Sequence, residues 1–330
     1  MTPQKHKDET LRSLVDLTEA IARKQLSVML YEDLHWADPT SLEVLDLLID
    51  RVRTIPLLIV FTHRPEFRSR WAQHGHVTGL NLSKLTRAQS GAMVSRVTGT
   101  KALPADLLEE ILTKTDGVPL FVEELTKSIL ESGELKDAGD HYDYSGTAHS
   151  ITIPATLRDS LMARLDRLGS AKEVAQLAAV LGREFTYDLV QRIAPQDQNT
   201  LQAGLGQLVA AELLYQRGRP PRARYVFKHA LIQDAAYASL LKSVRQQIHQ
   251  RTAQVLEAQC PEIVATQPEL LAHHLTEAGR LTEAVGYWQR AGERAVARSA
   301  HLEAISHLTT GVAVLQTLPE TAERIQQELL

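Results

Sequence analysis

The chain has 330 residues, which is enough for two or three domains that each bury a hydrophobic core. Its composition is 44% hydrophobic and 23% charged with a formal net charge of −4, which excludes a protein that is basic overall and built mainly to grip phosphate backbones. The single cysteine, Cys260, excludes an internal disulfide framework and favours a reducing compartment. No apolar run approaches the roughly 20 residues that cross a bilayer, and the first residues lack a signal-peptide pattern. We therefore expect a cytoplasmic protein with no membrane partner.

The first part of the chain has the pattern of a parallel α/β sheet. Apolar residues at helical spacing predict an amphipathic helix over residues 11–21. All-apolar runs predict buried strands over residues 28–31 and 57–61, and Asp38-Pro39 marks the start of a helix between them. This order is a βαβ unit, whose sheet we expect to be covered on both faces. We also expect a short third strand over residues 77–82.

Polar residues follow both predicted strands. Glu32 and Asp33 come directly after the first strand, and Thr62 and Arg64 follow the second. Because ligands of parallel sheets bind beyond the carboxyl ends of the strands, these residues should face one site. A buried strand that ends in two carboxylates is what a nucleotide-hydrolysing enzyme places beside a phosphate-bound magnesium ion, the Walker B arrangement. The alternative is an ordinary buried strand that happens to be followed by acidic residues.

The middle of the chain is mainly helical. Apolar periodicity predicts helices over residues 86–97, 105–115 and 121–130. Gly117 and Pro119 enforce a sharp turn before the last of these helices. Residues 133–150 contain many Asp, Gly, Tyr and Ser residues, and we expect a linker or an exposed hairpin there.

The region that follows has the order of a winged-helix domain. Two predicted strands flank the turn Gly218-Arg219-Pro220-Pro221-Arg222, and helices precede them. The expected helices cover residues 155–168, 170–181, 187–193 and 197–211, and the strands cover 213–217 and 224–227.

The last part of the chain repeats a helical pattern. The motif Glu283-Ala284-Val285 recurs as Glu303-Ala304-Ile305, and each copy is followed by one large apolar and one small residue. Small residues beside a large apolar residue are how stacked helical repeats pack, so we expect tetratricopeptide-like hairpins.

These blocks, taken in order, resemble the predicted ATPases of the signal-transduction type with numerous domains (STAND). The resemblance is to the AAA-like ATPase modules of bacterial regulators linked to class III adenylate or guanylate cyclases. The segments that carry it are MLYEDLHWADPTSLEVLDLL, LLIVFTHRPEF, TDGVPLFVEELTKSILESG, IPATLRDSLMARLDRL, FKHALIQDAAYASLL and LLAHHLTEAGRLTEAVGYWQRAGERA. The resemblance implies a P-loop ATPase core, a helical lid, a winged-helix domain and tetratricopeptide-like helices.

The resemblance also implies roles for individual residues. Glu32 and Asp33 match the Walker B acids, which hold Mg²⁺ through water and orient the attacking water, although the usual first residue is Asp. Thr62 and Arg64 match the sensor position that detects the γ-phosphate of ATP. Two further matches concern nucleotide binding: Gly117 and Pro119 correspond to a turn that packs near the adenine, and His229 to a histidine that contacts phosphates in some relatives.

One expected motif is missing. No GxxxxGK[ST] loop precedes the acid pair, so the chain has neither the backbone cradle nor the lysine that offset phosphate charge. The first strand of such a sheet is missing as well. We therefore interpret the chain as a fragment that lacks the N-terminal, Walker A part of its ATPase. ATPase activity is expected of the complete protein, and the chain alone is expected to be inactive.

Several other residues have ordinary explanations. His273 and His274 with Glu269, like His74 and His76, lack further metal ligands at a recognisable spacing. Cys260 has no catalytic partners nearby in the sequence. Four arginines crowd the predicted wing, but residues 197–211, the helix that would read a DNA groove, are poor in basic residues, which argues against a nucleic-acid partner.

The sequence therefore predicts an α/β region followed by mainly helical domains. The expected parts are a partial P-loop core (1–84), a helical lid (85–135), a linker (136–152), a winged-helix-like domain (153–240) and helical hairpins (241–330). The first hypothesis is an ATP/ADP- and Mg²⁺-dependent regulatory switch that meets a protein partner through its repeats, with a cyclase or other effector domain upstream. The alternatives are a scaffold that binds no nucleotide and a winged-helix DNA-binding regulator.

Overall fold

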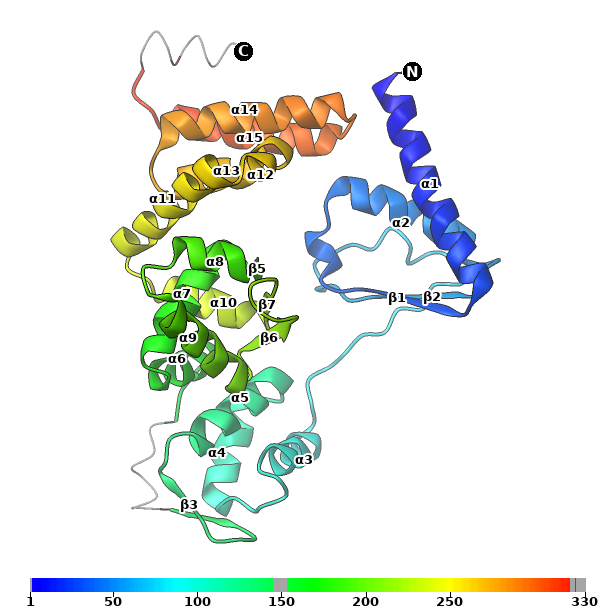
Figure 1. Cartoon of the computed structure of the whole chain (residues 1–330). Helices are drawn as coiled ribbons and strands as arrows, with labels where there is room; N and C mark the ends of the chain where they lie inside the picture. Colours follow the sequence, from blue (N-terminus) through cyan, green and yellow to red (C-terminus); the bar gives the residue numbers. More distant parts are fainter. Residues whose placement is uncertain (1, 145–152, 321–323, 325–330) are drawn as a thin grey trace. The chain divides into compact units, whose positions relative to one another are not determined.

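The computed structural model describes residues 2–144, 153–320 and 324, most of which are helical (Figure 1). The chain divides into two compact units. The first unit contains residues 1–81 and 256–330, and the second contains residues 82–255. None of the described helices combines the length and the apolar character that crossing a membrane requires.

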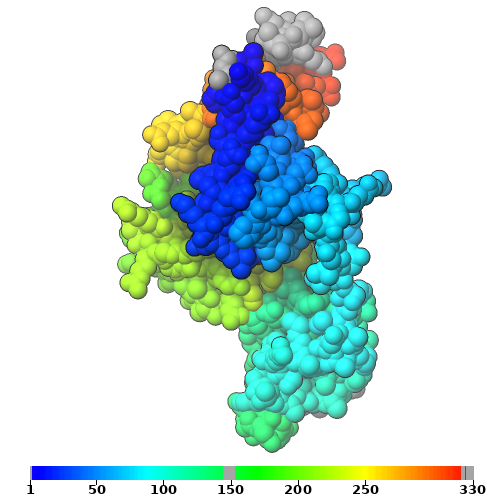
Figure 2. Space-filling model, turned by 90° about the vertical axis from the view of Figure 1, so that its right-hand side faces the viewer, coloured from blue at the N-terminus to red at the C-terminus, as the bar shows by residue number. Residues whose placement is uncertain are grey.

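The first unit begins with the predicted strand–helix–strand order, preceded by a longer helix than expected. Strands β1 and β2 pair in parallel, with Ser27 opposite Leu57 and Tyr31 opposite Phe61. Helix α2 begins where the sequence predicts, because Asp38 accepts a hydrogen bond from the Ser41 amide (2.8 Å) and Pro39 occupies the first turn. The elements are α1 (Pro3–Lys24), β1 (Ser27–Tyr31), α2 (Pro39–Val52) and β2 (Leu57–Phe61). Figure 2 shows α1, in dark blue, on the surface beside the segment that follows it.

Only one face of the β1–β2 pair is covered, so the expectation of two covered faces is wrong for the described residues. Helices α1 and α2 lie on the same side of the pair (Figure 1) and form a core with it that includes Val15, Leu45 and Leu57. On the opposite face the side chains expose between 39% and 65% of their surface: Val28, Leu30, Leu58 and Val60. Four apolar side chains on one face of a two-stranded sheet make a surface that a further element can cover.

The expected third strand over residues 77–82 is also wrong. These residues have no regular structure, and Leu80 and Leu82 are 84% and 97% exposed. An isolated apolar run becomes a strand only where a neighbouring strand supplies hydrogen-bond partners, and none of the described residues pairs with this run.

The second unit begins with three helices that agree closely with the predicted ones. Thr86 starts the first with a capping box to Gln89, and the helices pack around Ile111, Val122 and Leu125. Their bounds are α3 (Arg87–Val97), α4 (Ala105–Thr115) and α5 (Pro119–Leu130). Strands β3 (Leu135–Asp137) and β4 (Tyr142–Tyr144) then form an antiparallel hairpin within the predicted linker. The rest of that linker, residues 145–152, lies outside the described residues.

The remainder of the second unit combines helices with a three-stranded antiparallel sheet in the order β5-β7-β6. Its core includes Leu165, Tyr187, Leu205 and Phe227. The helices and the last two strands agree with the sequence, whereas the three-residue β5 was missed. The elements are α6 (Leu157–Arg167), α7 (Ser170–Leu181), β5 (Glu184–Thr186), α8 (Tyr187–Ile193), α9 (Gln198–Ala210), β6 (Leu214–Arg217), β7 (Arg224–Phe227) and α10 (Ala230–Ala238).

The chain ends in packed helices whose small residues are required by the packing. A Cβ atom on Gly292 would lie 2.4 Å from Leu308, and one on Gly311 would lie 3.0 Å from Trp288. This close approach of α14 and α15, which run side by side in Figure 1, explains the repeated small residues. The helices are α11 (Lys242–Gln259), α12 (Pro261–Thr266), α13 (Pro268–Glu277), α14 (Leu281–Ala297) and α15 (His301–Gln316).

A buried ion pair joins α5 to α6 in the second unit. Arg164 on α6 is 2% exposed and pairs with Glu124 on α5, whose side chain is fully buried. The same guanidinium donates to Glu131 (Nε to Oε2, 2.9 Å) and to the Ala211 carbonyl (2.8 Å). Three acceptors therefore offset the cost of burying one charge, and the pair fixes α5 against α6.

We predict that Arg164→Met destabilises the second unit by about 3–5 kcal/mol, because it leaves Glu124 buried without its charge partner. Urea unfolding followed by circular dichroism would measure the loss. Glu124→Met in the same background should recover part of it, and Arg158→Met, at an exposed position of α6, should cost less than about 0.5 kcal/mol. An unchanged unfolding midpoint in Arg164→Met would contradict the role of the pair.

Candidate functional site

The polar residues that follow β1 and β2 lie together, as the parallel pairing requires. The Asp33 amide donates to the Thr62 hydroxyl (3.0 Å), and the Leu34 amide donates to the Thr62 carbonyl (2.8 Å). In return, the Thr62 amide donates to the Tyr31 carbonyl (2.9 Å). These three hydrogen bonds hold the Glu32-Asp33 pair against Thr62 at one edge of the sheet.

Asp33 adopts a left-handed backbone conformation, with φ 54° and ψ 42°. A residue with a Cβ atom enters this region at a cost of about 1 kcal/mol or more, and such residues concentrate at functional sites. The conformation is held on both sides: Thr62 bonds the amide, and Leu34, which is 3% exposed, anchors the short 3-10 helix η1 (Leu34–Trp36) that follows. The turn thus fixes where the Asp33 carboxylate stands.

The oxygen atoms gathered at this edge suit a hard cation. Glu32 is exposed and Asp33 is half-buried, and the Thr62 hydroxyl retains a proton to donate. Carboxylate and hydroxyl oxygens are the ligands that Mg²⁺ prefers, usually together with several waters. The donor set therefore fits magnesium, which Glu32 and Asp33 would hold.

Arg64 lies near the same edge and is positioned by an aromatic ring. Its guanidinium carbon is 5.7 Å from the centre of the Trp36 ring, and Trp36 is 55% exposed. Sequence reasoning missed Trp36 and the neighbouring His35. Both ring nitrogens of His35 are buried and have no hydrogen-bond partner among the described residues. The signal was the position of these two residues between the acid pair and the Asp38-Pro39 helix start.

Gly117 and Pro119 lie in the second unit, at the turn between α4 and α5. Gly117 is buried with φ +71°, and a Cβ atom there would lie 2.2 Å from the Leu85 carbonyl oxygen. The Gly117 carbonyl also accepts a hydrogen bond from the Leu85 amide (2.8 Å). Pro119 occupies the first turn of α5. The backbone alone therefore requires glycine at this turn, whether or not a nucleotide binds near it.

His229 precedes α10 in the second unit and is half-buried. Burial lowers the pKa of its imidazole, and the neighbouring Lys228 charge lowers it further, whereas Glu124 and Glu123 oppose the shift. The ring is therefore neutral at pH 7 and can offer one donor and one acceptor.

A second ion-pair network lies close to His229. Glu123 on α5 accepts hydrogen bonds from Lys127 and Lys228, each at 2.8 Å, and Lys127 also pairs with Glu212. Burial raises the pKa of Glu123, but the two lysines outweigh it and bring the pKa to about 2. The network ties α5 to the turn before β6 and to the residue after β7.

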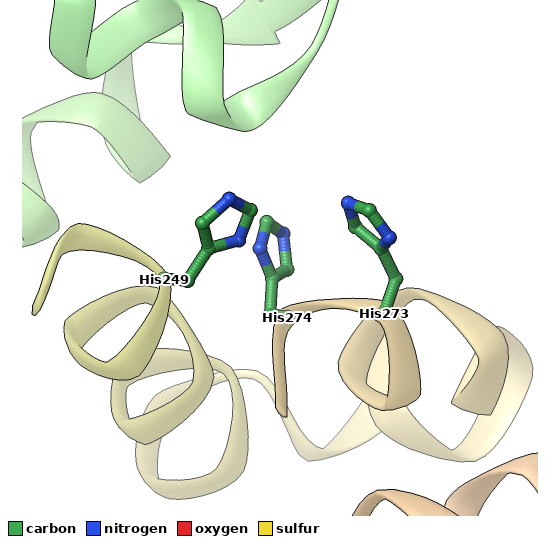
Figure 3. Close-up of side chains that lie close together, drawn as sticks. All are labelled: His249, His273 and His274. Carbon is green, nitrogen blue, oxygen red and sulfur yellow. The ribbon is translucent and has the colours of Figure 1, made fainter. Parts of the chain in front are cut away.

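We assign no metal site to the remaining histidine candidates among the described residues. Figure 3 shows His273 and His274 on α13 and His249 on α11. The ring centres of His273 and His274 are 5.4 Å apart. His249 belongs to the second unit and the pair to the first, so we assign no site to the three together. His76 lies 3.0 Å from the Ile49 carbonyl, a contact that explains its position without a metal.

Comparison with known proteins gives a relative that is similar in sequence over nearly the whole chain. An uncharacterized protein of Rhizobium meliloti (strain 1021) is 30% identical over 329 residues, which cover 98% of this chain and 32% of the relative. The chain thus spans about a third of that relative's length. No protein-family model matches the sequence.

Among solved structures, the chain is similar to a Signal Transduction ATPase with Numerous Domains (STAND) protein with a tetratricopeptide repeat sensor from Pyrococcus horikoshii. The match covers 92% of this chain and 45% of that protein, with 12% identity and a TM-score of 0.48. A likeness at this level assigns neither a fold nor an activity to the chain.

We predict that the backbone at Asp33 favours glycine. Asp33→Gly and Asp33→Ala both remove the carboxylate, so the difference between them reports the backbone alone. The glycine variant should be more stable by about 1 kcal/mol, because glycine has no Cβ penalty at positive φ. Thermal unfolding would measure this difference. Glu32, which has no positive φ, is the control position: its Gly variant should not exceed its Ala variant in stability.

We predict a pH-dependent contribution from Glu123. Because its pKa is lowered from 4.5 to about 2, its stabilisation is complete above pH 4.5 and is lost as the pH falls toward 2. Glu123→Gln should therefore cost about 1 kcal/mol at pH 7, because solvent screens these partly exposed ion pairs, and clearly less at pH 3 in urea unfolding. Glu173→Gln, at an exposed position of α7, should show no such pH-dependent difference. A loss for Glu123→Gln that is equal at both pH values would contradict the ion-pair account.

Proposed function

We propose that this chain is part of a signal-transduction ATPase, in which nucleotide binding controls the state of the attached helical domains. The observation that carries the proposal is the acid pair Glu32-Asp33, held by backbone hydrogen bonds against Thr62 at the carboxyl edge of a parallel strand pair. This is where ligands of parallel sheets bind and where a phosphate-bound magnesium ion needs carboxylates.

The residues at this edge would divide the work by their chemistry. Bound Mg²⁺ supplies positive charge that neutralises phosphate oxygens. Glu32 and Asp33 would hold the ion through water, and one of the two carboxylates would orient the attacking water. Thr62 would donate its hydroxyl proton, and Arg64 its guanidinium N–H groups, toward the terminal phosphate of ATP.

We further propose that the β1–β2 pair is completed by strands and a phosphate-binding loop from outside this chain. The supporting observations are the uncovered apolar face formed by Val28, Leu30, Leu58 and Val60, and a relative about three times as long as this chain. No Gly-Lys dipeptide occurs in the sequence, so a Walker A lysine must come from elsewhere. A cyclase or another effector domain is a candidate for part of the same longer protein.

The rest of the chain would transmit the nucleotide state. In the second unit, α5 follows the Gly117 turn and is joined by ion pairs to α6 and to the β6–β7 region, which we interpret as a winged-helix domain. At the C-terminal end, α15 exposes an apolar stripe that fits a neighbouring repeat or a protein partner: Leu302, Ile305, Leu308 and Val312, exposed by 40% to 61%. Apolar residues at this helical spacing are how stacked helical repeats meet their next element.

A second candidate function is a scaffold that binds partners without nucleotide. The α15 stripe and the missing phosphate loop favour it, and the sheet would then have only a structural role. Nucleotide titration distinguishes the two functions.

We predict that isothermal titration calorimetry with ATP and Mg²⁺ detects no binding to this chain alone. A longer version that extends upstream through a GxxxxGK[ST] loop should bind ATP. Asp33→Asn in the longer version should lower ATP turnover at least about tenfold while ATP still binds. Asp50→Asn, an exposed substitution at the far end of α2, is the control and should leave turnover unchanged. Failure of the longer version to bind ATP would overturn the ATPase proposal and leave the scaffold.

A further inference from the structure

The three-stranded sheet of the second unit has one apolar and one polar face. Because side chains alternate along a strand, Phe185, Tyr225 and Phe227 point to the same side, and all three are buried. The intervening residues form the outer face, which contains Glu184 and Thr186 from β5, Arg224 and Val226 from β7, and Tyr215 and Arg217 from β6. Glu184 is the only acid among them.

Two arginines stand directly opposite each other on this outer face. Arg217 pairs with Arg224 in the register of β6 and β7, and like charges at paired positions destabilise a hairpin. Glu184 compensates Arg224 in part through an exposed ion pair at 3.3 Å. Arg217 is exposed and has no ion pair with any described residue. An anion bound over the outer face, in contact with both guanidiniums, would offset the repulsion between Arg217 and Arg224.

The turn adds two more guanidiniums to the same end of the hairpin. Arg219 and Arg222 begin and end a four-residue turn that is closed by the Arg222 amide donating to the Arg219 carbonyl (3.0 Å). Gln216 donates to the Gly218 carbonyl (2.9 Å) and steadies the approach to the turn. Both arginines are exposed and unpaired among the described residues. The arginine hairpin, meaning Tyr215, Arg217, Arg219, Arg222 and Arg224, therefore carries three uncompensated positive charges.

We propose that the arginine hairpin binds the phosphodiester backbone of a nucleic acid. All four cations are arginines, whose planar fork matches phosphate oxygens, and the hairpin has no lysine. Tyr215 is 53% exposed on the same face as Arg217 and offers a ring to a base or a sugar. An acidic membrane surface fits less well, because the hairpin has no exposed aliphatic side chain that would enter lipid.

The contact would be independent of base sequence. Helix α9, the helix that would enter a groove, has no lysine or arginine and begins at Asp197, whose charge repels phosphate. Helix α9 is the element whose composition argued against a nucleic-acid partner, although the sequence also placed four arginines at the wing. The structure adds the strand register, which puts Arg217 opposite Arg224 on one face of the hairpin.

Fluorescence anisotropy with labelled duplex DNA, single-stranded DNA and duplex RNA would test this inference on the full chain. The logarithm of the duplex DNA affinity should fall with the logarithm of salt concentration with a slope of about −2.7, as expected for three neutralised phosphates. The triple variant Arg217→Gln, Arg219→Gln and Arg222→Gln should lose about tenfold or more in affinity at low salt, and its slope should approach zero. Comparing the affinities for duplex DNA, single-stranded DNA and duplex RNA shows which kind of nucleic acid the hairpin prefers.

A matched control removes the same charge elsewhere. Arg12, Arg158 and Arg298 are exposed, and their triple Gln variant should bind as the wild type does. Replacing the three hairpin arginines with Lys should retain the salt slope.

If the triple hairpin variant fails to fold, as judged by circular dichroism, the turn variant Arg219→Gln with Arg222→Gln should still lower both the affinity and the slope. Equal binding by hairpin and control variants would overturn the proposal, as would preferential binding of phosphatidylserine vesicles or polyglutamate.

Discussion

The parallel pairing of β1 with β2 is the constraint on which the candidate site depends. It brings residues 29 positions apart to one edge, where the Asp33 amide meets the Thr62 hydroxyl. Helix α2 makes the return connection and can pack on the sheet only because Leu45, Leu48 and Ile49 are buried against it. Without this pairing, no hydrogen bond from β2 would offset the free-energy cost of the left-handed conformation of Asp33. The positions of the two carboxylates would then not be fixed.

The sequence correctly predicted those helices and strands whose bounds depend on local sequence patterns. The bounds of β2, α4, α7 and α8 follow from caps, prolines and apolar periodicity, and each agrees with the structure. Patterns that depend on a distant partner were predicted less well. The apolar runs around Val28 and Leu58 look the same whether or not a neighbouring element covers them, and residues 77–82 form a strand only if another strand is adjacent.

The Arg164–Glu124 pair joins residues 40 positions apart, and no sequence signal marks such a contact. Of the site residues, Asp33 and Thr62 lie in contact as the sequence predicted. The site that they would form with Glu32 and Arg64, and the role of each residue, remain predictions.

Helix α5 in the second unit receives two kinds of ion pair with different energetic character. Arg164 and Glu124 are almost completely buried, so separating them would leave two charges without water, and the joint between α5 and α6 is therefore rigid. Lys127 and Lys228 retain access to solvent, and Glu212 is 60% exposed, so water can replace these contacts at a much smaller cost. A change that starts at the Gly117 turn would thus carry α5 and α6 together and would first loosen the contacts with the β6–β7 region.

Charge at the candidate site limits what the described residues can do by themselves. Glu32 and Asp33 bring two negative charges to the edge, and Arg64, held over Trp36, brings one positive charge, which leaves a net charge of −1. ATP carries several negative charges, so the bare edge repels it at the distances at which phosphate would contact the carboxylates. In the proposed ATPase, Mg²⁺ would reverse the local sign, and a phosphate-binding loop would supply backbone donors to the phosphates. The carboxylates would then act on a nucleotide that other groups hold. Their fixed position against Thr62 would contribute orientation, whereas the binding energy would come from those other groups.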